Sequence, residues 1–144
     1  MHDTIAPLID QARTNPQRGN GAEALALYRQ PADRARQSGD ADRLAHCLRH
    51  IGIITLDDND HESALSAGQE AVAIYRECAD DPLELANALR VTALAHSALG
   101  ATDQAARCWV DARAIYLKLD IASGVAEADR WRAITPQKPP PAQP

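Results

Sequence analysis

The chain has 144 residues, of which 45% are apolar, 24% charged and 3% aromatic, and its net charge at pH 7 is −5. This length is enough for one folded domain that needs neither disulfides nor a structural metal. The acidic balance and the lack of a long apolar run argue against nucleic acid and membranes as partners.

The sequence predicts helices along most of its length, because alanine is abundant and glycine and proline are rare before residue 135. Capping signals mark helix ends, as in Asp81-Pro82 before one apolar run and Leu99-Gly100 after it. Apolar residues between such signals recur at spacings of three and four. We place helices over residues 3–15, 20–38, 40–57, 60–79, 81–99, 102–118 and 121–134.

The chain repeats itself with a period of 41 residues, since a shift of 41 without a gap superposes residues 41–81 on residues 82–122. Identical residues then coincide at Leu44 and Leu85, Ala45 and Ala86, Leu48 and Leu89, Arg49 and Arg90, and Tyr75 and Tyr116. A shorter copy precedes this pair, and a half copy follows at a shift of 40, where Arg130 coincides with Arg90. A period of this size indicates stacked repeats that cover each other's apolar faces.

The repeated positions resemble the tetratricopeptide repeat, which has a large residue, Leu-Gly, a second large residue, a small turn residue, Ala, an aromatic and Ala at fixed offsets. The third copy carries this pattern as Leu89, Thr92-Ala93, His96, Gly100, Ala105, Trp109 and Ala112. The long period is similar to that of kinesin light chain repeats. The resemblance implies an all-α, right-handed α-solenoid of three antiparallel helix pairs, at residues 3–38, 40–79 and 81–118, with a capping helix at 121–134. We therefore expect a repeat domain over residues 1–134 and a disordered, Pro-rich tail over residues 135–144.

Two residues depart from the pattern. Pro31 stands where the later copies have alanine, and a proline inside a helix removes a backbone hydrogen bond, so its helix is predicted to bend or split. Gly68 stands where Tyr28 and Trp109 supply an aromatic ring. Either Gly68 gives room to a neighbouring residue or it leaves a small cavity.

In tetratricopeptide arrays the first helix of each pair lines a concave groove, so the resemblance assigns partner contacts to the outward positions of these helices. Counting from the motif gives His46, Arg49, His50, Ile53, Asn87, Arg90, Val91, Leu94, Arg130 and Trp131. The three arginines occupy one equivalent position in successive copies, and each guanidinium group could bind a carboxylate or phosphate through two hydrogen bonds. The alternative is that they pair with neighbouring acids, such as Glu84 or Glu127, and only solvate the surface.

No motif for catalysis or cofactor binding is recognisable, so we expect a protein that is not an enzyme and has no cofactor. His46 and His50 are one helical turn apart, but a zinc site needs three or four ligands, so no metal site is predicted. The three cysteines form no CxxC pair, and Asp3 lies where a signal peptide would be basic. Both observations favour a cytoplasmic protein with free thiols.

The sequence thus indicates a non-catalytic interaction module or scaffold that binds a protein or peptide partner with acidic groups in its concave groove. Two alternatives remain open. The open ends of a short array could support self-association as a homodimer. A small-ligand or metal sensor would instead use the histidines and arginines of the groove.

Overall fold

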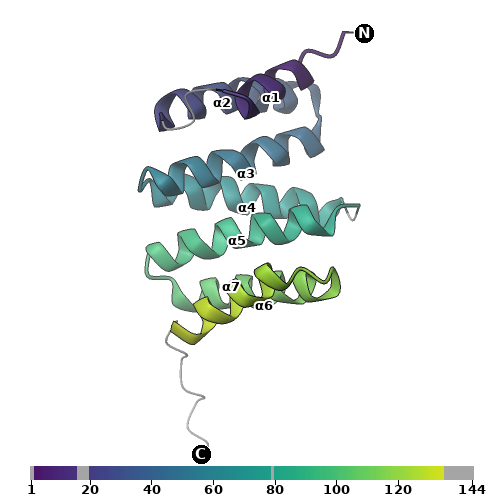
Figure 1. The fold of residues 1–144 in the computed structure, drawn as a ribbon. Coiled ribbons are helices and arrows are strands. Elements are labelled where there is room, and N and C mark those ends of the chain that lie inside the picture. The colour runs from purple at the N-terminus through teal and green to yellow at the C-terminus, as the bar shows by residue number, and fades with distance from the viewer. Residues whose placement is uncertain (1, 16–19, 79, 135–144) are drawn as a thin grey trace, which may run out of the picture.

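The computed structural model describes residues 2–15, 20–78 and 80–134, and seven helices follow one another in these ranges in a single stack (Figure 1). They are α1 (Ala6–Arg13), α2 (Gly21–Ser38), α3 (Ala41–Asp57), α4 (His61–Glu77), α5 (Pro82–Ala98), α6 (Thr102–Lys118) and α7 (Ala122–Ile134). Each helix lies inside the range predicted for it, and no strand occurs in the described ranges. The fold is an all-α helical repeat solenoid, as predicted, while the predicted tail over 135–144 lies outside the described residues.

Local sequence signals explain where the helices begin and end. The side chains of Asn20, Asp40, Asp60 and Asp81 each accept a hydrogen bond from the backbone N–H three residues later, with distances of 3.2 or 3.3 Å. Gly39, which follows α2, and Gly100, near the start of the α5–α6 turn, have φ angles of 73° and 79°. Glycine adopts this left-handed conformation without the steric cost that a side chain adds.

Each helix packs against the next one along the chain, and α3 also contacts α5. The first helices of the pairs, α1, α3 and α5, together with α7, therefore form one layer of the array, and α2, α4 and α6 form the other (Figure 1). We call the surface of the layer that contains α1, α3, α5 and α7 the first-helix face.

The core of the array consists mainly of alanine, with a few large residues between the helices. Ala45, Ala86 and Ala105 have no exposed surface, and neither has Trp109. Small side chains let neighbouring helices approach closely, and the large rings fill the space where the helices diverge. The abundance of alanine in the sequence thus reflects close packing as well as helix propensity.

The two departures from the repeat pattern have different structural outcomes. Helix α2 runs without a break through Pro31, which is buried, so the predicted split of this helix does not occur. Tertiary packing supplies most of the stability of a helix in a protein, which makes one missing backbone hydrogen bond tolerable here. Gly68 does give room to a neighbour, because a Cβ atom there would lie 2.6 Å from Oγ1 and 3.3 Å from N and Cα of Thr92.

Helix α7 carries charged residues where the internal helices carry apolar ones. In the repeat register, Asp129 of α7 corresponds to Leu89 of α5, and Arg113 of α6 corresponds to Val72 of α4. Leu89 and Val72 are buried, whereas Nε of Arg113 donates to Oδ1 of Asp129 over 2.7 Å in a partly exposed ion pair. A partly exposed ion pair of this kind suits a surface that meets water.

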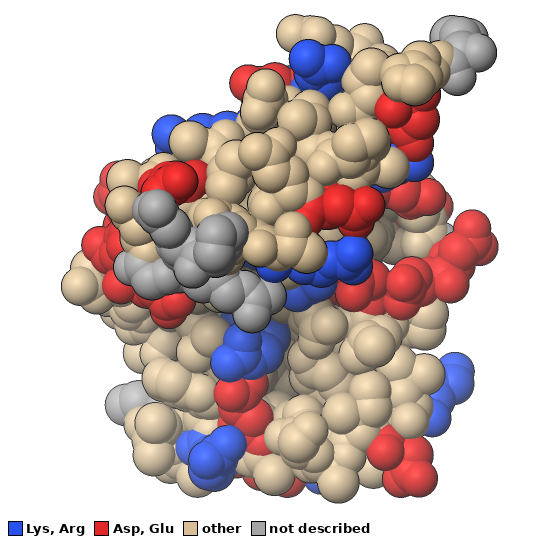
Figure 2. Space-filling model, turned by 45° about the horizontal axis from the view of Figure 1, so that its top comes forward, with Lys and Arg blue, Asp and Glu red and all other residues tan. Residues whose placement is uncertain are grey.

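Ion pairs connect helices of successive repeats on both layers. On the first-helix face they join Arg43 to Asp3, Arg49 to Glu84, and Arg90 to Glu127. On the opposite layer they join Arg36 to Glu70 and Arg76 to Asp111. Figure 2 shows basic side chains interleaved with acidic ones on the face that it presents, rather than gathered in one basic patch. Across the described part of the chain, no helix combines the length and the apolar character needed to span a bilayer.

Candidate ligand-binding groove

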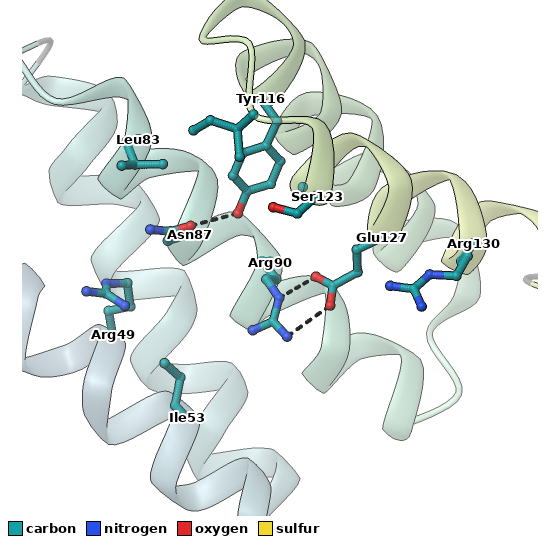
Figure 3. A pocket seen from close by; sticks show the side chains of 11 residues that line it. Arg49, Ile53, Leu83, Asn87, Arg90, Tyr116, Ser123, Glu127 and Arg130 are labelled. Atoms are coloured by element: carbon teal, nitrogen blue, oxygen red, sulfur yellow. Dashed lines mark hydrogen bonds and ion pairs between the residues drawn. The ribbon is translucent and has the colours of Figure 1, made fainter.

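A pocket of about 430 Å³ lies on the first-helix face, where α3, α5 and α7 come together (Figure 3). It is lined by Arg49, Ile53, Leu83, Asn87, Arg90, Tyr116, Ile121, Ser123, Gly124, Glu127 and Arg130. Half of the ten predicted groove residues are in this set, namely Arg49, Ile53, Asn87, Arg90 and Arg130. The three arginines, which follow one another at spacings of 41 and 40 residues in the sequence, therefore lie at one pocket in space.

Two of the three arginines are paired with acids of the next helix of the same layer. Nε of Arg49 donates to Oε2 of Glu84 over 3.2 Å, and the two side chains are only 15% and 20% exposed. Arg90 binds Glu127 through both Nε and Nη2, and the Nη2–Oε2 distance is 3.0 Å (Figure 3). Pairing with these two acids, which was the alternative interpretation from the sequence, is thus the arrangement in the structure.

Arg130 differs from the other two arginines. It is exposed, and it forms no ion pair with any residue in the described ranges. Figure 3 shows its side chain extending toward the Arg90–Glu127 pair from α7. Among the residues that the structure describes, no carboxylate therefore pairs with this guanidinium group of the pocket.

Asn87 and Tyr116 form a neutral polar contact beside the arginines. The Tyr116 hydroxyl donates to Oδ1 of Asn87 over 2.7 Å, which leaves the amide NH₂ of Asn87 as a donor (Figure 3). The orientation of this amide is fixed because Tyr116 is buried and burial raises the pKa of its hydroxyl, which stays protonated. Leu83 and Ile121 add apolar surface to the same pocket.

Of the five predicted groove residues that do not line this pocket, three pack against neighbouring helices. Val91 is 1% exposed, and its Cγ1 lies against Gly52 of α3, where a Cβ atom would come within 2.6 Å. Leu94 packs with Trp109, and Trp131 stacks on Trp109 with a ring-centroid distance of 6.1 Å. Burial makes Val91 inaccessible to a partner, whereas Leu94 and Trp131 are only partly buried.

The pocket also contains residues that the sequence did not predict as groove contacts. Tyr116 both fills the core and points its hydroxyl into the pocket. Ser123 and Gly124 lie in the first turn of α7, where no motif marks them. Only the close approach of α7 to Tyr116 brings this turn to the pocket, and a three-dimensional contact of that kind leaves no local signal in the sequence.

The two predicted groove histidines, His46 and His50, lie against each other, beside the main pocket. Their ring centroids are 4.7 Å apart, and His50 also stacks on Tyr28 at 4.7 Å with an interplanar angle of 6°. His46 lines a neighbouring pocket with Glu84, whose Oε2 is 3.9 Å from Nδ1 of His46 and also accepts a hydrogen bond from Tyr75. Among the residues that the structure describes, no group of three or more His, Cys, Asp or Glu side chains is placed to hold a metal ion.

The environment of His50 keeps its ring neutral. Burial lowers the pKa of His50 to about 3, and the nearby charges of Arg49, His46 and Arg13 act in the same direction. Burial also lowers the pKa of His46, with a further contribution from Arg49. A neutral His50 can accept a hydrogen bond, and Nη2 of Arg49 lies 3.4 Å from its Nε2.

We expect the array to lose stability as the pH falls from 7 to 5. The unfolded chain binds a proton at His50 near pH 6.5, whereas the folded protein does so only near pH 3, so protonation below 6.5 favours the unfolded state. The loss is roughly 1 kcal/mol at pH 5, because the partial exposure of the ring reduces the full linkage value. Urea unfolding at pH 7, 6 and 5 measures it.

The variant His50→Phe is the control for this prediction, because it keeps a ring against Tyr28 but cannot bind a proton. Its stability should change less between pH 7 and 5 than that of the wild type, with the remainder due to His46. An equal pH dependence in both proteins would show that His50 is not the titrating group.

Comparison with known proteins adds one finding. Residues 3–77, just over half of the chain, match a family model described as "Tetratricopeptide repeat". None of the curated proteins compared with the chain is similar to it.

Proposed function

Because this chain belongs to the tetratricopeptide repeat family, we propose that it is a non-catalytic module that binds an acidic segment of a partner protein on its first-helix face. Tetratricopeptide repeats generally mediate protein–protein interactions, and the family is generally non-catalytic. The observation that carries the proposal is the pocket between α3, α5 and α7, where Arg49, Arg90 and Arg130 converge.

The chemistry of the pocket suits an extended peptide with both acidic and apolar side chains. Arg130 offers a guanidinium group to a carboxylate, and a charge-assisted bond of this kind is stronger than a neutral one. The amide NH₂ of Asn87 is placed to donate to a peptide carbonyl, while Leu83 and Ile121 offer apolar contacts. The pocket volume of about 430 Å³ accommodates a few residues of such a segment and no folded domain.

The proposal extends the repeat assignment beyond the matched residues 3–77. We propose that α5 and α6 form a third repeat and that α7 caps the array, giving one domain over residues 1–134. The support is the register of 41 residues that aligns Arg49 with Arg90, together with the charged residues of α7 at apolar positions of the internal helices. The three free cysteines support a cytoplasmic location, since reducing compartments keep thiols unpaired.

Removing Arg90 and Arg130 together should weaken binding of an acidic peptide at least about tenfold, since each charged hydrogen bond contributes about 1.5–3 kcal/mol. The probe is a fluorescein-labelled decapeptide of alternating Glu and Leu, and fluorescence anisotropy measures its affinity for wild type and Arg90→Ala/Arg130→Ala. The same peptide with Gln in place of Glu should bind weakly to both proteins. Raising the salt concentration should reduce binding to the wild type.

The matched control is Arg76→Ala/Arg113→Ala, which also removes two arginines but from α4 and α6, where they pair with Asp111 and Asp129. This control should bind the Glu-Leu probe within about twofold of the wild type, because rim charges far from a site contribute little. Equal losses in both double variants would mean that net charge, and not the pocket, governs binding. Absence of binding to the wild type would refute the proposal.

A further inference from the structure

The guanidinium group of Arg90 is already bound to a carboxylate of the protein, that of Glu127 (Figure 3). This carboxylate binds two nitrogens of the group, which is the geometry that an incoming carboxylate would adopt. Glu127 comes from α7 and is about one-fifth exposed, so it lies at the pocket and not beneath it. Its only hydrogen-bond partner among the described residues is Arg90.

The acid of α5 that pairs with Arg49, Glu84, is held more firmly. Glu84 accepts hydrogen bonds from both Arg49 and the Tyr75 hydroxyl, and His46 lies 3.9 Å from the same oxygen. Displacing Glu84 would break several contacts and leave the Tyr75 hydroxyl without its acceptor. Displacing Glu127 would break only its bond with Arg90, and the freed carboxylate could turn toward solvent.

Arg130 lies three residues after Glu127 on the same helix, so the two side chains project from one side of α7. Since Arg130 has no acidic partner within the described ranges, it can bind a carboxylate without breaking an existing ion pair. Figure 3 shows the guanidinium group of Arg130 on the same side of α7 as Glu127, and both residues line one pocket with Arg90, so a carboxylate bound to Arg130 would enter the pocket that holds the Arg90–Glu127 pair.

From these contacts we infer that Glu127 is a specificity-determining residue that occupies the place of the ligand carboxylate on Arg90. An acidic group of the partner first binds Arg130 and then replaces Glu127 on Arg90. This inference rests on the proposed function and adds to that function the step at which the pocket selects its ligand. Segments with two or more carboxylates at this pocket can complete the exchange, whereas singly charged segments lose the competition with Glu127.

A purely structural role for Glu127 and a competing role predict opposite changes in ligand affinity when its charge is removed. If its carboxylate served only to tie α5 to α7, removing its charge would loosen the pocket and weaken ligand binding. If it competes with the ligand, removing its charge frees Arg90 and strengthens ligand binding. The two roles therefore differ in the sign of one measured change.

The test measures the affinity of the labelled Glu-Leu decapeptide for wild type and Glu127→Gln by fluorescence anisotropy. We expect Glu127→Gln to bind about fivefold more tightly, since a partly exposed ion pair contributes up to about 1 kcal/mol. The matched control is Asp129→Asn, which makes the same change in net charge on α7 but at the residue that pairs with Arg113. Asp129→Asn should stay within about twofold of the wild type.

A second measurement follows the Arg90 side chain directly. In ¹⁵N-resolved NMR spectra the Nε–Hε signal of Arg90 should shift when the probe binds to the wild type, because the carboxylate that it contacts is exchanged. In Glu127→Asp the carboxylate is one methylene shorter and no longer reaches both nitrogens, so this variant should bind the probe more tightly than the wild type and less tightly than Glu127→Gln. Thermal unfolding of each variant shows whether it is folded at the temperature of the titration.

The outcomes separate this inference from the proposed function. If the wild type binds the probe and Arg90→Ala/Arg130→Ala does not, while Glu127→Gln binds no better than the wild type, the exchange is refuted and the binding function stands. If a folded wild type and a folded Glu127→Gln both fail to bind the probe, the acidic-ligand function is refuted and the exchange with it. Tighter binding by Glu127→Gln, without a similar gain in Asp129→Asn, supports both.

Discussion

Replacing Gly68 with tyrosine is expected to lower the free energy of unfolding by about 3 kcal/mol or more, because it overfills the contact between α4 and α5. The repeat pattern alone suggests that an aromatic residue fits at position 68, since Tyr28 and Trp109 stand at the equivalent positions. A Cβ atom at Gly68, however, would lie 2.6 Å from Oγ1 of Thr92 and 3.3 Å from its backbone. Urea unfolding followed by circular dichroism measures the loss.

The matched control is Ser66→Tyr, which adds the same side chain at an exposed position two residues earlier on α4. Its stability should stay within about 0.5 kcal/mol of the wild type. Gly68→Ala should lose less than Gly68→Tyr, because the gain in helix propensity of about 1 kcal/mol partly offsets the clash with Thr92. A Gly68→Tyr protein as stable as the wild type would contradict the close contact.

The variant Gly124→Ala should both destabilise the array and weaken binding of the acidic probe. An added Cβ atom would lie 2.6 and 2.7 Å from the Cδ2 and Cδ1 atoms of Tyr116, whose ring is buried and hydrogen-bonded to Asn87. Since the ring cannot move aside, α7 must shift, and Glu127 and Arg130 shift with it. We expect a loss of about 1–3 kcal/mol in stability and a loss of probe affinity of at least about tenfold.

Stability is measured by urea unfolding, and affinity by fluorescence anisotropy with the Glu-Leu decapeptide. Ser123→Ala is the stability control, because it adds no atoms at the neighbouring, exposed position. The emission of Trp131, which stacks on Trp109 across the α6–α7 contact, reports whether α7 has moved in the folded protein. Unchanged stability and unchanged affinity in Gly124→Ala would show that α7 does not depend on this contact.

The helices could be predicted from the sequence because their signals are local. Asp40, Asp60 and Asp81 stand directly before the helices that they cap, and each accepts a hydrogen bond from the backbone N–H three residues later. Gly100 lies just after the end of α5, as its sequence position suggests. The repeat register adds long-range information, since residues that recur at a fixed spacing occupy equivalent places in the stack. This register is also what brings Arg49, Arg90 and Arg130 to one pocket.

The sequence could not predict which neighbours of these arginines are accessible. Val91 follows Arg90 directly, but successive residues of a helix point about 100° apart, and Val91 faces α3. Trp131 follows Arg130 and packs on Trp109 for the same reason. Whether Glu127 pairs with Arg90 or points to solvent depends on the distance between α5 and α7, which is set by the contact of Gly124 with Tyr116.

The stacking of each helix on its immediate neighbours has a mechanical consequence. In the described part of the chain the helices contact their near neighbours in the stack. Bending or stretching the stack is therefore distributed as small changes over all of these interfaces. The distances between α3, α5 and α7 can then change at a low cost in free energy. A ligand that bridges Arg90 of α5 and Arg130 of α7 depends on the spacing of these two helices, so tension along the array would alter the affinity for the ligand.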